Sequence, residues 1–314
     1  MPLSELYQVD WRIFMTAAAA WLDGKSPYGA LSSDFGAGAF AYPPTALPWL
    51  ALFLPARGAG FYIWSLLELL LWWVLIRKDL RSQWVLIFWS PMILHFYEGQ
   101  STLAIALVVW AAARAERRGF LWGLALAWAL TKPQVALFPL GFLLFRERAA
   151  PLRFRLWAGI ALGTLLLALP ATLRHPGIWL EWLESFASYR SRLLQLAPWQ
   201  GASALLVLLV FVLWYRSRRG GFEWLFSAAV FPQTSFYSTV VLLPALRPST
   251  SYWSLAGLAL AALLQGPMSY GTLTWLLAGH LLAAWMITGG PRVAGSAADR
   301  DGRSPASRSG ERGP

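Results

Sequence analysis

The sequence predicts an all-α, polytopic integral membrane protein in which short helices surround an outward-facing cavity. Hydrophobic residues make up 57% of the 314 residues and charged residues only 13%, whereas soluble domains have about 45–50% apolar and about 25% charged residues. Apolar segments recur, with short polar breaks, between residues 43 and 288. Many are shorter than the roughly 20 residues that a simple spanning helix needs, and short, proline-broken helices are tolerated where they line a water-filled cavity.

The chain divides into three predicted parts. Residues 1–42 are polar and predict an extracytoplasmic segment whose alanine-rich stretch, Trp11 to Leu22, forms an amphipathic helix on the membrane surface, because it is too short and too polar to cross a bilayer. Residues 43–290 predict a transmembrane domain of about 11 helices with an outer loop at 171–197. Residues 291–314 predict a disordered cytoplasmic tail. The apolar segments lie at 44–56, 58–76, 82–94, 101–113, 119–131, 133–145, 156–170, 198–215, 222–232, 237–246, 253–265 and 271–288.

The basic residues indicate which helix ends face the cytoplasm. Strict alternation of the segments from residue 58 onward puts most of the 26 Lys and Arg residues on one side, as expected for cytoplasmic loops. The stretches at 95–100, 131–134 and 171–197 then lie outside, and the 44–56 segment must dip into the membrane and return. Because nothing before residue 42 can carry that segment across, we expect that a first transmembrane helix is missing from this sequence.

Composition also excludes several classes of protein. Without cysteine there is no disulfide, thiolate metal site or cysteine nucleophile. The net charge is +11, but the basic residues sit between apolar segments, so we expect no nucleic-acid partner. No outer stretch has the ligand spacing of a metal site, and we expect no cofactor.

Polar residues that can support chemistry gather in the predicted outer stretches. Lys132 and Glu98 lie at junctions of apolar segments, where an ionisable group is costly unless it faces a cavity or a partner. The candidate site residues are Asp10, Tyr28, Tyr42, His95, Glu98, Gln100, Lys132, Arg174, Arg190 and Arg192.

The order of several short motifs resembles a known family. The motifs are an early Asp before Asp23-Gly24-Lys25-Ser26-Pro27-Tyr28, then Phe40-Ala41-Tyr42-Pro43-Pro44, Glu98-Gly99-Gln100, Arg117-Arg118-Gly119, Lys132-Pro133 and Phe231-Pro232-Gln233-Thr234-Ser235-Phe236-Tyr237. The ordered set resembles glycosyltransferase family 87, the polyprenol-phosphate-mannose-dependent alpha-1,2-mannosyltransferases of the GT-C class. That family usually has a transmembrane helix before the early Asp.

The resemblance implies a multi-pass enzyme of a bacterial-type plasma membrane with an extracytoplasmic active site. It would transfer a hexose such as mannose, with inversion, from a polyprenyl-phosphate sugar to a lipid-linked or cell-envelope glycan. Asp10 matches the early position and would be the single general base. The leaving lipid phosphate needs charge stabilisation, which Lys132, Arg174, Arg190 or Arg192 would supply.

Each residue also has a purely structural interpretation. Asp10 would cap or flank a surface helix, and Lys132 would snorkel to the interface. His95 would be satisfied by a neighbouring helix, while Glu98 and Gln100 would be packing groups at a helix start. The arginines would touch only lipid headgroups.

Two other functions remain open for the whole chain. A secondary transporter or permease predicts internal repeats and ionisable pairs along a through-path, and Glu68 is the ionisable residue in the middle of an apolar segment. We expect Glu68 to be paired inside the bundle. An inactive GT-C-like membrane scaffold is the other alternative.

Overall fold

The computed structural model describes residues 7–185, with gaps at 30, 32–34, 36–38, 57, 77–89, 116–118 and 147–149, together with Leu208, Val212, Val240 and Val241. These residues form helices and turns, and no strand occurs among them. The all-α prediction is therefore confirmed for this part of the chain. The segments predicted from 198 onward, the tail at 291–314, Arg190 and Arg192 lie outside the described residues, apart from the four single positions named above.

The helices follow the predicted apolar segments closely. Their bounds are α2 (Val9–Leu22), α3 (Leu47–Ala51), α4 (Ala59–Ile76), α6 (Ser90–Glu98), α7 (Thr102–Arg114), α8 (Phe120–Ala129), α9 (Pro133–Arg146) and α10 (Ala150–Arg174). The largest differences are at α6, which continues past the predicted end at 94, and at α10, which is longer than the predicted 156–170 at both ends.

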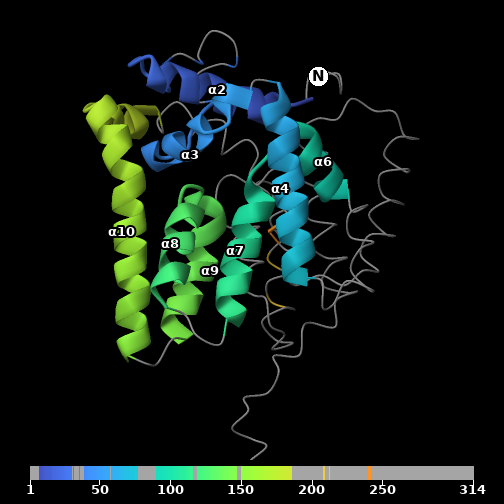
Figure 1. Ribbon diagram of the computed structural model, residues 1–314, viewed down its shortest axis with the longest axis vertical. Helices are drawn as coiled ribbons and strands as arrows, with labels where there is room; N and C mark the ends of the chain where they lie inside the picture. The colour runs from blue at the N-terminus through green and yellow to red at the C-terminus, as the bar shows by residue number, and fades with distance from the viewer. Residues whose placement is uncertain are drawn as a thin grey trace, which may run out of the picture.

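Helices α4, α7, α8, α9 and α10 run roughly side by side, and α2 lies across one end of this group (Figure 1). Helices α4, α7 and α9 run away from α2, whereas α8 and α10 run toward it. The connections at 95–100 and 131–134 therefore lie at the α2 end. Arg114 and Arg153 lie at the opposite end, as the alternation of the segments predicts.

The 44–56 segment is broken into short pieces beneath α2. A 3₁₀ turn at Pro44–Ala46 leads into α3, and a second 3₁₀ turn follows at Leu54–Ala56. Proline cannot donate a main-chain hydrogen bond, and Pro44, Pro48 and Pro55 recur too often for one long helix to form. The segment nevertheless packs against both α2 and α10.

Helix α2 is enclosed more than a helix on the protein surface would be. Trp11, Phe14 and Trp21 are nearly inaccessible, and Ala17 and Ala18 are fully buried. The small alanine side chains allow close packing, and α2 contacts α3, α6 and α10. The predicted helix is thus present, and it forms a packed layer over the end of the other helices.

Helices α8 and α10 approach each other through glycine. A Cβ atom on Gly159 would lie 2.9 Å from Cα of Gly123, and one on Gly163 would lie 2.6 Å from Cβ of Ala127. Small residues spaced by four on two facing helices let the backbones meet, which is typical of helix pairs in membranes.

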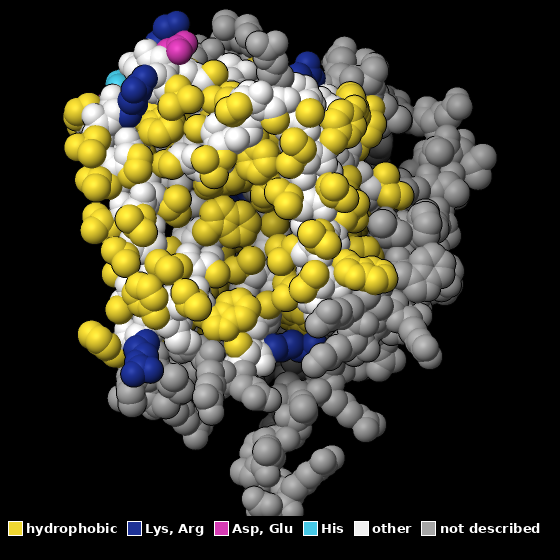
Figure 2. All heavy atoms as spheres, in the orientation of Figure 1, with side chains coloured by type: hydrophobic (Ala, Val, Ile, Leu, Met, Phe, Trp, Pro, Cys, Tyr) yellow, Lys and Arg dark blue, Asp and Glu magenta, His cyan; other side chains and the backbone are white. Residues whose placement is uncertain are grey.

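One face of the molecule is largely apolar. Hydrophobic side chains cover it between basic groups at its two ends (Figure 2). Large exposed side chains on α4 and α10 include Leu66, Trp73, Leu165 and Leu169.

By length and composition, one helix among the described residues, Arg153–Arg174 with a mean hydropathy of 1.9, can cross a membrane, whereas the other apolar helices among them are shorter.

Candidate active site

A tight turn after α6 directs two candidate residues toward α2. The N–H groups of Gly99 and Gln100 both donate to the carbonyl of His95, at 3.1 Å each. Gly99 has φ +77°, a left-handed conformation that glycine adopts without steric cost and that commonly ends helices. Glu98 and Gln100, on either side of Gly99, therefore lie at the start of α2.

Replacing Gly99 by Ala should lower the free energy of unfolding by about 2–5 kcal/mol. The added Cβ would lie 2.7 Å from Cβ of Trp11, and this overpacking of about 1–3 kcal/mol adds to a left-handed backbone cost of about 1–2 kcal/mol. Gly24→Ala is the matched control, because Gly24 has φ +75° but a Cβ there meets nothing within 4 Å. Unfolding of the purified chain in detergent micelles measures both variants, and equal losses would show that the Trp11 contact costs nothing.

Gln100 connects an acidic and a basic side chain. Its Nε2 donates to the carboxylate of Asp10, and its Oε1 accepts from Nζ of Lys132 at 2.5 Å and from the hydroxyl of Tyr42 at 3.3 Å. Its backbone carbonyl accepts from the indole N–H of Trp64 at 3.1 Å. The amide therefore has one orientation, with nitrogen toward the acid and oxygen toward the base.

Lys132 is buried within this group. Its side chain is 2% exposed, and Nζ also donates to Oγ1 of Thr102 at 2.7 Å. The same nitrogen lies 5.2 Å from the centre of the Tyr42 ring, a distance at which a cation is attracted to the ring face. Lys132 does not snorkel toward the surface. Asp10, Tyr42, Glu98, Gln100, Thr102 and Lys132 are called the Gln100 cluster below.

Asp10 is the accessible member of the Gln100 cluster. It lies in the first turn of α2. The N-cap residue of this helix is Gln8, and no side chain caps the helix by a hydrogen bond, so Asp10 does not act as a cap. Asp10 retains partial exposure, whereas Glu98 is 5% and Gln100 2% exposed. Asp10 is therefore the least enclosed residue of the cluster, although its carboxylate points inward to Gln100.

Burial and mutual repulsion control the protons of the cluster. Burial, followed by the negative charge of Asp10 and a hydrogen bond to it, raises the pKa of Glu98 to about 10. Burial also raises the pKa of Asp10, but the hydrogen bond from Gln100 and the charge of Lys132 oppose that rise. Burial lowers the pKa of Lys132 to about 8, whereas the nearby carboxyl groups act to raise it. Near neutral pH, Glu98 therefore holds a proton and Lys132 remains a cation beside Asp10.

A second buried pair lies next to the Gln100 cluster. Nε2 of His95 is 2.9 Å from Oε2 of Glu68, and the two side chains are 0% and 1% exposed. Oε1 of Glu68 accepts the N–H of Ala104 at 3.1 Å. The predicted pairing of Glu68 inside the bundle is confirmed, and His95 is satisfied at Nε2 by a neighbouring helix. Its Nδ1 has no hydrogen-bond partner among the residues that the structure describes.

Tyr28 supports the cluster from the loop after α2. Its hydroxyl donates to the carbonyl of Tyr42 at 3.0 Å, and both rings contact Phe40. Tyr28 is 7% and Tyr42 6% exposed, so the aromatic group forms a wall beside Lys132.

Arg174 is not brought to the cluster. Its guanidinium donates to the carbonyl of Leu22, at the opposite end of α2 from Asp10. Twelve residues of α-helix separate Leu22 from Asp10, which is about 18 Å along the axis. As the structure stands, Arg174 joins α10 to α2 and does not contact the cluster.

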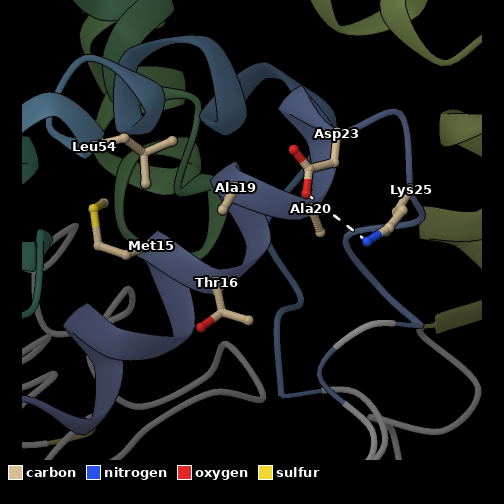
Figure 3. A pocket seen from close by; sticks show the side chains of 7 residues that line it. All are labelled: Met15, Thr16, Ala19, Ala20, Asp23, Lys25 and Leu54. Carbon is tan, nitrogen blue, oxygen red and sulfur yellow. Dashed lines mark ion pairs between the residues drawn. The ribbon is translucent and has the colours of Figure 1, made fainter. Parts of the chain in front are cut away.

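An open cavity of about 470 Å³ lies along α2 (Figure 3). Its lining residues are Met15, Thr16, Ala19, Ala20, Asp23, Lys25 and Leu54. Ala19 lies about two and a half helical turns after Asp10 and therefore on the other side of α2. The cavity is thus separate from the Gln100 cluster, and its rim carries the exposed pair Lys25 and Asp23, 3.9 Å apart.

The structure assembles Asp10, Tyr42, Glu98, Gln100 and Lys132, with Tyr28 and His95 adjoining them. The sequence did not predict the hydrogen bond between Lys132 and Thr102, nor the one from the N–H of Ala104 in α7 to Glu68. Each of these residues starts or interrupts an apolar segment, but nothing in the sequence identifies its partner. Among the described residues, no group of three or more His, Cys, Asp or Glu side chains is arranged to hold a metal ion.

No protein-family model, no curated protein and no solved structure matches this chain. No residue role therefore comes to it from a relative.

Proposed function

We propose that the chain is a membrane glycosyltransferase of the GT-C class. It transfers a hexose, with mannose the first sugar to test, from a polyprenyl-phosphate sugar to a lipid-linked or cell-envelope glycan. One observation carries the proposal: the carboxylate of Asp10, a partly exposed residue, is joined through the amide of Gln100 to a buried ammonium group, Lys132. This arrangement supplies a base and a positive charge close together.

The reaction needs each of these groups once. Asp10 removes the proton from the acceptor hydroxyl, whose oxygen attacks the anomeric carbon of the sugar. The bond from that carbon to the phosphate oxygen breaks, and the lipid phosphate leaves with the electron pair. Attack from the face opposite the leaving phosphate inverts the anomeric configuration. The positive charge of Lys132 favours the negative charge that develops on the leaving group, and in a buried site this effect is stronger than in water.

The membrane setting of the proposal rests on the surface and on the charges. The apolar face of α4 and α10 suits contact with lipid, and the helix ends opposite α2 lead into the Lys- and Arg-rich connections. The Gln100 cluster would then lie on the extracytoplasmic side of a plasma membrane. The proposed partners are membrane lipids, the polyprenyl-phosphate sugar and a glycan acceptor, with no cofactor and no nucleic acid.

Transfer of labelled mannose tests the proposal. Membranes from cells that express the chain are supplied with polyprenyl-phosphate mannose, and membranes without the chain are the control. Chain-dependent labelling of a glycolipid or glycan is the expected result. If no hexosyl donor supports labelling, the enzyme proposal is wrong.

A transporter is the second candidate, and the Glu68–His95 pair favours it because buried ionisable pairs occur along proton paths. The buried polar and charged side chains among the described residues are Thr45, Glu68, His95, Glu98, Gln100, Ser101, Thr102, Thr131 and Lys132. These residues are concentrated toward the α2 end, and they do not continue along α7 or α9 to the other end. Proton-coupled uptake into vesicles that contain the chain would favour the transporter.

Transfer should decline as the pH rises through about 8. Burial lowers the pKa of Lys132 to about 8, so its positive charge is present below that pH and is lost above it. Arginine keeps its charge to a much higher pH than lysine. In Lys132→Arg, the decline of the transfer rate should therefore begin at a higher pH, even if the rate itself is lower. Initial rates at limiting donor between pH 6.5 and 9.5 measure this, and an unchanged decline in Lys132→Arg would assign the titration to another group.

A further inference from the structure

Glu68 is a buried carboxylate that joins three helices. It belongs to α4, its Oε2 lies 2.9 Å from Nε2 of His95 in α6, and its Oε1 accepts the N–H of Ala104 in the first turn of α7. A carboxylate at this end of a helix also interacts favourably with the helix dipole. One side chain therefore ties α6 and α7 to α4.

The two partners of Glu68 flank the turn that carries Gln100. The carbonyl of His95 accepts the N–H groups of Gly99 and Gln100, and Ala104 follows Gln100 by one helical turn. Holding His95 and Ala104 with one carboxylate limits how far the turn can move. The direction of the Gln100 amide toward Asp10 thus depends on a residue that does not touch Asp10.

Glu68 also supplies charge near Lys132. The carboxyl groups that act on Lys132 are Asp10 from α2, Glu68 from α4 and Glu98 from α6. Glu98 holds its proton near neutral pH because its pKa is raised to about 10. Glu68 is thus one of the carboxyl groups that oppose the effect of burial on Lys132.

We propose that Glu68 is a positioning residue of the Gln100 cluster. Its carboxylate binds His95 and Ala104 on either side of the turn that presents Gln100 to Asp10, and it is electrostatically coupled to Lys132. The effect on catalysis rests on the proposed function. The electrostatic coupling of Glu68 to Lys132 does not, so the two are tested separately.

A double-mutant cycle tests the coupling without any assay of activity. Glu68→Gln keeps the size of the side chain and an oxygen for the N–H of Ala104, and Lys132→Met removes the ammonium. The melting temperature of the full chain in micelles is measured at pH 7 and pH 10 for both single variants and for the double variant. At pH 7, the drop in melting temperature caused by Glu68→Gln should be at least about twice as large in the chain with Lys132 as in the chain with Lys132→Met.

At pH 10 this difference should largely disappear, because Lys132 is then neutral. Ser65→Ala is the control, since within the described part of the chain the Ser65 hydroxyl on the same helix has no hydrogen-bond partner. This variant should show no coupling with position 132 at either pH. Equal losses for Glu68→Gln in both backgrounds at both pH values would overturn the coupling.

The transfer assay tests the positioning role. In Glu68→Gln, turnover should fall and the alkaline decline should move about one pH unit lower, because Lys132 loses a stabilising neighbour. A purely structural loss would reduce the rate without moving the decline, and that result would overturn the proposal. If the unchanged chain shows no transfer, the proposed function fails, whereas the melting data still decide the coupling.

Discussion

Asp10→Asn should reduce sugar transfer at least about 100-fold, because the loss of a general base typically costs a factor of about 10² to 10⁴. Asparagine has nearly the same shape and keeps an oxygen that can accept the hydrogen bond from Gln100. The turn and the position of Lys132 should therefore be retained, and donor binding should change little. Initial rates and donor affinity, measured on the same membranes, separate the two effects.

Asp23→Asn is the matched control for this prediction. Asp23 follows the last residue of the same helix, its side chain is 66% exposed, and its carboxylate lies 3.9 Å from Lys25. This variant makes the same chemical change outside the Gln100 cluster and should transfer sugar at nearly the normal rate. Near-normal turnover in Asp10→Asn would remove Asp10 from the role of base.

Gly159→Leu should lower the free energy of unfolding by about 2 kcal/mol or more. A Cβ at this position would lie 2.2 Å from the carbonyl oxygen of Phe120 and 2.9 Å from Cα of Gly123. These atoms belong to the backbone of α8, so the two helices must separate. The better helix propensity of leucine offers only about 1 kcal/mol in return, whereas overpacking against rigid neighbours costs about 1–3 kcal/mol and occasionally more.

Ala161→Leu is the control for helix α10. Ala161 is exposed, so leucine there adds apolar surface without meeting α8, and stability should change by less than about 0.5 kcal/mol. Thermal unfolding in micelles compares the two variants. A melting temperature for Gly159→Leu equal to that of Ala161→Leu would show that α8 and α10 are not in contact at this point.

The helix bounds were predictable where polar residues interrupt apolar runs. Helix α7 begins just after Gln100 and Ser101, and α9 begins just after Lys132, because uncompensated polar groups are costly inside an apolar helix. Helix α6 extends through His95 to Glu98, and the local sequence pattern does not predict this extension. The partners of these two side chains, Glu68 and Asp10, come from other helices.

The membership of the cluster was predictable in part. Glu98 and Lys132 were selected by their positions at junctions of apolar segments, and Asp10 and Gln100 by motifs that resemble the family. The structure brings these four residues together. Arg174 was selected as a basic residue of the predicted outer loop, but α10 continues to that residue, and its guanidinium reaches only the far end of α2. Which helix end meets which depends on packing between helices, and a single sequence does not encode that in its local periodicity.

The length of α8 has a consequence for the lipid around the protein. Its ten residues span about 15 Å, roughly half of the 30 Å hydrocarbon core of a typical bilayer. Lipids adapt to short apolar elements by local thinning. In the proposed membrane setting, headgroups beside α8 would sit deeper than those in the surrounding leaflet. The phosphate of a lipid-borne sugar would then reach the level of Lys132 without leaving its own leaflet.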